Sequence, residues 1–198
     1  MPRFLHAMSG TANRQRTTLV FAGSEWEEVR MDPSKEVSPA IRDSFPDMRE
    51  VEDNSFDAVY TAHSLERLYP HQAMAALGNC RRVLKEDGYL VVICADIQEA
   101  CAMASQDGLL ETAYESPAGP VTPLDILYGF RPALAAGRLD LACHCGFTAK
   151  VLMSSLAQSG FGTVWASKNS KTFSMAALAT KPKRSKAYLM ELVRQHFG

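Results

Sequence analysis

Short apolar runs alternate with polar or helical segments over the first half of the chain. The runs occupy residues 3–8, 28–31, 39–42, 56–61 and 89–95. This alternation predicts parallel strands joined by crossovers, because parallel neighbours need a connection that returns to the same end of the sheet. The run at 89–95 is apolar throughout, which indicates a central strand buried on both faces. We therefore predict an α/β fold that begins with five strands.

Helical spacing appears between and after these runs. In residues 71–88, Leu77 and Leu84 belong to a three- and four-residue repeat, and Asp87-Gly88 predicts the helix end and a turn. Residues 97–106 predict the next helix. Residues 11–23 contain Thr17-Thr18 and other poor helix formers, so we expect a short, non-helical crossover there.

Residues 109–146 interrupt the pattern with several prolines, glycines and aromatic side chains. Such a long irregular stretch is typical of a lid or substrate loop with short helices. The remaining predicted elements are a helix at 148–159 with Thr148 as N-cap, antiparallel strands at 161–167 and 172–180 around a turn at 168–171, and a helix at 187–197 after the basic linker KPKRSK. We expect residues 1–198 to form a single domain: a mostly parallel Rossmann-like sheet with helices on both faces and a C-terminal antiparallel hairpin.

Composition narrows the function classes. The chain has 198 residues, 46% of them hydrophobic and 22% charged, and a net charge of −1. This suits one sizeable core and gives no general attraction to nucleic acid or anionic membranes. No apolar run approaches a membrane span, and the N-terminus has no basic segment followed by an apolar one. The five cysteines are odd in number, which favours reduced thiols in a cytoplasmic protein. Cys143-His144-Cys145 lacks a second cluster that would complete a zinc site, so we expect no metal.

Two longer stretches are more specific. SFDAVYTAHSLERL, residues 55–68, is followed at 81–90 by RRVLKEDGYL. Both stretches and their spacing resemble class I S-adenosylmethionine (SAM)-dependent methyltransferases, specifically a small bacterial, type-11-like branch. The resemblance covers residues 4–106 and extends to Gly146-Phe147-Thr148. Arg67 and Glu86 depart from it, because relatives commonly have His and Pro there. The predicted antiparallel C-terminal strand is also usual in these methyltransferases.

The resemblance implies a SAM site at the carboxyl ends of the strands, near the switch in strand order. Asp32 stands roughly 20 residues after Gly10, the spacing expected of a ribose-binding carboxylate. Asp43 matches the family's acidic position that meets the adenine amino group. Asp32 could alternatively be a turn residue, Asp43 a helix cap and Glu66 a solvated helix charge. The full implied cofactor set is His6, Ala7, Met8, Ser9, Gly10, Asp32, Asp43, Ser44, Phe45, Ala62 and His63.

The loop FLHAMSGTANRQ, residues 4–15, carries one glycine, Gly10, and has Met8 where cofactor loops often carry another. The G-x-G-x-x-G spacing of nicotinamide-binding proteins is absent, which disfavours an oxidoreductase. SAM has no phosphate, so it needs a tight turn with approachable backbone rather than several glycines and a helix N-terminus. We interpret the stretch as a degenerate SAM loop, in which Met8 points either into the sheet or into the cofactor's place.

The implied activity is methyl transfer from SAM to a small molecule or a cell-envelope precursor. His63 is the first candidate for a general base, since histidine titrates near neutral pH. His71, Tyr128, Arg131 and His144 are candidate substrate residues, although structural roles are open for all of them. No (Asp/Asn)-Pro-Pro-(Tyr/Phe) sequence follows the fourth strand, so we expect no nucleic-acid substrate; a homodimer is left open. The alternative is a catalytically inactive methyltransferase-fold protein that acts as a binding or scaffold subunit.

Overall fold

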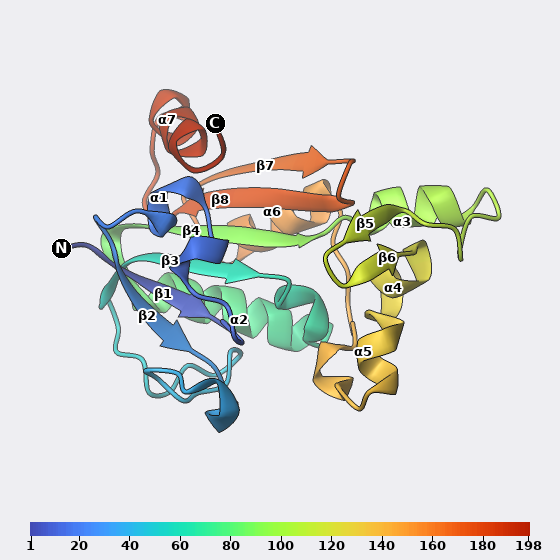
Figure 1. Cartoon of the computed structure of the whole chain (residues 1–198). Helices are drawn as coiled ribbons and strands as arrows, with labels where there is room; N and C mark the ends of the chain where they lie inside the picture. The colour runs from blue at the N-terminus through green and yellow to red at the C-terminus, as the bar shows by residue number, and fades with distance from the viewer.

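The computed structural model describes residues 1–198 and centres on a six-stranded sheet (Figure 1). The strands are β1 (Arg3–Ala7), β2 (Glu27–Met31), β3 (Phe56–Ala62), β4 (Leu84–Ala95), β7 (Thr163–Asn169) and β8 (Ser174–Thr180), in the order β2-β1-β3-β4-β8-β7. β2, β1, β3 and β4 are parallel, whereas β8 runs antiparallel to both β4 and β7. The predicted mostly parallel sheet with a C-terminal antiparallel hairpin is thus confirmed.

Helices connect the strands, and residues 109–146, here called the lid segment, follow β4 and α3. The helices are α1 (Leu19–Ala22), α2 (Pro70–Val83), α3 (Ile97–Ala104), α4 (Pro123–Tyr128), α5 (Arg131–Ala135), α6 (Ala149–Gln158) and α7 (Lys186–Phe197), with 3-10 turns η1 (Arg14–Arg16), η2 (Lys35–Val37), η3 (Leu65–Arg67) and η4 (Leu139–Leu141). The lid segment also holds a small hairpin of β5 (Tyr114–Ser116) and β6 (Gly119–Val121). In Figure 1 this hairpin, α4 and α5 gather beyond the ends toward which β3 and β4 point.

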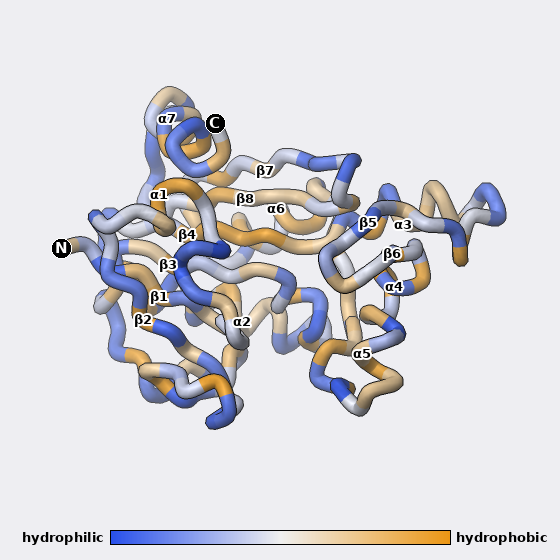
Figure 2. Tube along the Cα trace, viewed as in Figure 1, coloured by the Kyte–Doolittle hydropathy of each residue, from blue (hydrophilic) through white to orange (hydrophobic).

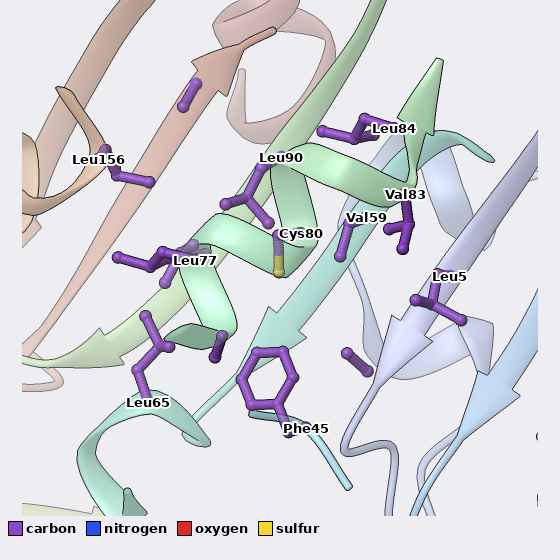
Figure 3. Close-up of a cluster of buried hydrophobic side chains, with 14 of the residues drawn as sticks. Leu5, Phe45, Val59, Leu65, Leu77, Cys80, Val83, Leu84, Leu90 and Leu156 are labelled. Atoms are coloured by element: carbon purple, nitrogen blue, oxygen red, sulfur yellow. The ribbon is translucent and has the colours of Figure 1, made fainter. Parts of the chain in front are cut away.

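Alternating residues of the strands fill two cores, one on each face of the sheet. On one face Leu5, Val59 and Leu90 pack with Leu77 of α2 and Leu156 of α6 (Figure 3). Full burial of one such side chain contributes about 1.5–3 kcal/mol relative to exposure. Figure 2 shows the corresponding concentration of apolar residues along the central strands.

The second core lies beneath α1 and α7. Phe4, Tyr60 and Val91 of the strands pack here with Phe21 of α1 and Leu189 of α7. Because neighbouring strand residues point to opposite faces, Phe4 and Leu5 enter different cores. The sheet is therefore covered on both sides, as its continuous apolar strands require.

Three sequence predictions about element boundaries were wrong. Residues 39–42 form no strand: only Ile41 pairs beside β2, through a bridge to Met31, because Pro39 has no N–H and Ser38 before it turns into a left-handed conformation. The segment 11–23 is not free of helix, since burial of Phe21 stabilises the single turn α1 despite poor propensity.

The third difference concerns the end of α2. This helix stops at Val83, not at Asp87-Gly88, and β4 begins at the next residue. Leu84 pairs with Phe56 and Tyr89 with Ala58, so the residues between them bulge out of register. The turn signal Asp87-Gly88 thus lies in a strand irregularity.

The C-terminal half follows its predictions more closely. Thr148 caps α6 by accepting a hydrogen bond from the Val151 amide, and β7 and β8 pair as predicted, although the turn lies between Asn169 and Ser174. The structure has no helix whose length and hydropathy would let it cross a membrane.

His196 ties α7 to the rest of the second core. It is 2% exposed, and its Nδ1 lies 2.6 Å from Thr18 Oγ1 while its Nε2 lies 3.0 Å from the Tyr89 hydroxyl. Both partners are uncharged, so burial lowers the pKa of His196 from 6.5 to about 4. The folded chain thus holds this imidazole neutral at pH values where an unfolded chain would protonate it.

We predict that acid destabilises the fold through His196. The pKa of His196 is lower in the folded chain than in the unfolded chain. The contribution of neutral His196 to the free energy of unfolding is therefore complete above pH 6.5 and is lost as the pH falls toward about 4. At 1.36 kcal/mol per pH unit, the loss reaches about 3 kcal/mol. Urea unfolding at several pH values should show a flatter profile for His196→Gln than for wild type. His71→Gln, at an exposed histidine, is the matched control; identical profiles for all three proteins would contradict the assignment.

Candidate functional site

The carboxyl ends of β1, β2, β3 and β4 meet at one edge of the sheet. A cleft of about 260 Å³ opens there beside the ends of β3 and β4, and His63, Glu66 and Ala95 line it from the sheet side. The lid segment supplies most of the opposite wall, including Tyr114 and Phe130. Open parallel sheets bind ligands at this edge.

His63 is held at the end of β3 in an unusual backbone conformation. Its φ is 50°, in the left-handed region that residues with a Cβ rarely adopt. Its amide donates to the Ile93 carbonyl of β4 at 2.8 Å. The side chain is about half exposed, and its Nδ1 lies 3.2 Å from Oε1 of Glu66. The turn therefore places an accessible imidazole at the cleft.

Glu66 is only 4% exposed. Its Oε1 accepts from the Ala95 amide at 3.2 Å as well as meeting His63, whereas its Oε2 is buried and has no partner in the protein. Burial opposes its ionisation, but the hydrogen bond and charge of His63 and the amide bonds outweigh burial and lower the pKa of Glu66. The alternative of a solvated helix charge at this position is wrong.

The loop after β1 retains its turn without a second glycine. Met8 has φ of 56° and packs against the main core, so its side chain follows the first of the two orientations considered from the sequence. Gly10 has φ of 53°, and no atom lies within 4 Å of the position that a Cβ would occupy. The backbone at Gly10 is therefore open to close approach.

Two charged side chains of β2 and its end fix this loop. Asp32 Oδ2 accepts from the Gly10 amide at 2.8 Å, and its Oδ1 accepts from the Ser34 amide at 2.9 Å. Arg30 donates to Ser9 Oγ at 3.2 Å and to the Gly10 carbonyl at 2.5 Å. Asp32 and Ser9 are both buried. The ligand role that the resemblance implies for Asp32 stays a prediction; the structure gives this carboxylate a loop-holding role.

Asp43 also bonds to its own segment. Its two carboxylate oxygens accept from the Ser44 and Glu50 amides, each at 2.7 Å. Phe45 is 1% exposed and belongs to the main core. Of this predicted trio, Phe45 packs in the interior, while Asp43 and Ser44 shape the turn.

The other predicted cofactor residues lie within the strands. His6 is buried, with Nδ1 2.6 Å from Oε1 of Glu28, and burial lowers its pKa although Glu28 acts in the opposite direction. Ala7 is fully buried, and Ala62 is partly buried beside the second core. Since Ala7 pairs with Thr61, Met8 just after β1 lies beside Ala62, the last residue of β3.

The four predicted substrate residues do not converge on the cleft. His71 and His144 are exposed and stack on Tyr69, with ring centroids 6.1 and 4.5 Å from the tyrosine ring. Tyr128 is 62% exposed and does not line the cleft, whereas its neighbour Phe130 does.

Arg131 serves the interior of the lid segment. Its Nε lies 2.8 Å from Asp125 Oδ1, and its Nη2 contacts Asp125 Oδ2 at 3.3 Å and Thr122 Oγ1 at 3.2 Å. Burial opposes ionisation of Asp125, but these bonds to Arg131 and Thr122 prevail and lower its pKa. This buried carboxylate holds the lid segment together through Nε and Nη2 of Arg131, whose side chain is 47% exposed, and the anion-binding role of Arg131 stays a prediction.

Glu66 is the site residue that the sequence interpretation did not select. Its signal was its position three residues after His63, a spacing that brings side chains together in a helical turn. Cys143 also lines the cleft, and Cys145 donates its thiol to the Leu65 carbonyl. The structure contains no group of three or more His, Cys, Asp or Glu side chains that could hold a metal ion.

Comparison with known proteins supports the fold. Residues 16–92 match the type-11 family model described as a methyltransferase domain. Similar solved structures include a SAM-dependent methyltransferase of Thermotoga maritima, described as a possible histamine N-methyltransferase (14% identity, 91% of this chain and 83% of that chain, TM-score 0.57). Another is a SAM-dependent methyltransferase of Methanosarcina mazei (15%, 92% and 93%, 0.60). No curated protein matches the chain. The resemblance to class I SAM-dependent methyltransferases, and their fold, are confirmed.

We predict that Asp32→Asn loosens the loop after β1. The substitution removes the charge from the acceptor of the Gly10 amide, and a hydrogen bond to a charged group contributes about 1.5–3 kcal/mol. Hydrogen exchange of the Gly10 amide should accelerate by roughly tenfold or more. Asp107→Asn, at an exposed residue far along the chain, should leave this exchange unchanged; equal protection in both variants would count against the loop-holding role.

Proposed function

We propose that the chain is a SAM-dependent methyltransferase that methylates a small molecule held in the cleft beneath the lid segment. The position of His63 carries this proposal. The residue follows Ala62, which ends β3 beside Met8, and it lines the cleft. An imidazole thus stands between the loop of Gly10 and the space where an acceptor would lie.

The residues at the loop fit SAM. Gly10 presents open backbone, and Met8 is turned into the core instead of across the loop. Each oxygen of Asp32 accepts one amide, and a carboxylate offers about four acceptor positions, which leaves capacity for ribose hydroxyls. When bound, SAM supplies a methyl group activated by its positively charged sulfur.

The chain's own contribution is to align the acceptor, exclude water and receive a proton. Tyr114 and Phe130 of the lid segment give the cleft an apolar wall that limits water. Glu66 orients His63: a carboxylate at Nδ1 favours the tautomer with the proton on that nitrogen and leaves Nε2 as the acceptor. In this proposal His63 takes the proton that the acceptor loses.

Cysteine chemistry supports a reducing compartment for this activity. All five cysteines are free, and burial raises the pKa of Cys143 and of Cys145 to about 11. An odd number of thiols without a disulfide is typical of a reducing compartment. We therefore place the enzyme in the cytoplasm.

The second candidate function is a binding protein that has kept the fold without the chemistry. Its support is that both oxygens of Asp32 and both of Asp43 already accept bonds from the chain. None of the five principal cavities is lined by Gly10, Asp32 or Asp43. A SAM site would then have to form by movement of the loop.

Calorimetry with SAM and S-adenosylhomocysteine separates the two functions. For the methyltransferase, both should bind with saturable heat, and Asp32→Asn should weaken binding roughly tenfold or more because its neutral amide is a weaker acceptor for ribose hydroxyls. Asp107→Asn should bind as wild type does. Absence of heat from both compounds up to millimolar concentration would instead favour the binding protein.

A further inference from the structure

Oε2 of Glu66 is a buried acceptor that the fold leaves unused. Oε1 of the same carboxylate meets both His63 and the Ala95 amide, so the protein satisfies one oxygen twice and the other not at all. A buried polar atom without a partner costs about 1–3 kcal/mol, so such atoms call for an explanation. Since Glu66 lines the cleft, a ligand there is the available source of a donor.

The cleft around this carboxylate is mostly apolar. Tyr114, Val121, Ile126, Phe130 and Phe173 line it. Its volume of about 260 Å³ lies just below the roughly 300–1,000 Å³ of sites for drug-sized ligands, which favours a smaller molecule. The walls therefore fit a small ligand with an apolar, flat or branched body.

The cleft lining also contains the charged residues Asp125 and Arg67. Asp125 is neutralised by Arg131 within the lid segment. Arg67 acts on Asp140, whose pKa is lowered first by its hydrogen bond with Arg138 and also by the charge of Arg67. Arg67 itself forms no ion pair. Among the acceptors of the residues that line the cleft, Oε2 of Glu66 is the buried one that lacks a donor.

We propose that the cleft binds a small amine, whose N–H group donates to Oε2 of Glu66 while its apolar body lies against the lid segment. An amine suits this oxygen because it donates in both its neutral and its protonated form, and the protonated form adds attraction to the carboxylate. A carboxylate ligand would face Glu66 with like charge. That the amine is the methyl acceptor rests on the proposed function; its binding at Glu66 does not.

The test compares three probes of similar size that share one apolar body: 2-phenylethylamine, 2-phenylethanol and phenylacetate. Each is titrated without SAM into the ¹⁵N-labelled full chain, and amide shifts are followed by NMR. The amine should move the amides of Glu66 and Ala95 and bind roughly tenfold or more tightly than phenylacetate, with the alcohol between them. This selectivity in the wild type needs no variant.

Glu66→Gln then isolates the acceptor. It keeps the shape of the side chain but replaces Oε2 with an NH₂ donor, so amine binding should weaken roughly tenfold or more. Glu115→Gln makes the same chemical change at an exposed position on the lid segment, outside the cleft, and should bind the amine as wild type does.

Three results would overturn the proposal: no probe moves the cleft amides at millimolar concentration, the amine binds equally well to Glu66→Gln, or phenylacetate binds best and loses its affinity in Arg67→Gln. The SAM titration described above is run on the same samples. Amine binding without SAM binding would reject the methyltransferase and keep the amine site. SAM binding without amine selectivity would reject the amine site and keep the methyltransferase.

Discussion

The placement of β3 between β1 and β4 is the constraint on which the site depends. Its pairing with β1 brings Ala62 beside Met8, and its pairing with β4 brings His63 to the Ile93 carbonyl. Parallel strands end at the same edge of the sheet. These two pairings therefore place the loop of Gly10 on one side of the turn at His63 and the cleft on the other. Without the central position of β3, the proposed cofactor and acceptor regions would not adjoin.

Both loops at this edge begin with a backbone conformation that glycine usually supplies. Met8 and His63 have positive φ, which costs a residue with a Cβ roughly 1–2 kcal/mol. Packing of Met8 against the main core offsets the cost in one case, and hydrogen bonds of His63 offset it in the other. Such strain persists where the surroundings fix it, which is consistent with a site organised before a ligand arrives.

The sequence predicted what periodicity and local chemistry determine. The strands around residues 56–61 and 89–95, the Thr148 cap and the antiparallel hairpin all depend on local patterns and were confirmed. The missing strand at 39–42 and the helical turn of Phe21 were not predictable in this way, because partners distant in sequence decide them.

The site residues also divide into those that local spacing indicated and those whose roles depend on contacts in the folded chain. Asp32 and Gly10 were selected by spacing and do contact each other, although their bond to one another could not be anticipated. Arg131 was expected to face a ligand, but its partner Asp125 lies in the same segment, and only the folded lid segment shows that the two charges neutralise each other. The role of Glu66 was left open because burial, unlike charge, cannot be seen in a single acidic residue of a polar stretch.

The backbone of Glu66 links its side chain to the lid segment. Its carbonyl accepts from the amides of His144 and Cys145, at 2.8 and 3.1 Å, while the residue lines the cleft. One residue thus joins the end of β3 to the last turn of the lid segment. A donor bound at Oε2 would contact the same short 3-10 turn that anchors this segment. Binding at the acceptor and positioning of the apolar wall would therefore be coupled. In this proposal, the coupling gives a reason for an ionised side chain at a position where an apolar one would bury at lower cost.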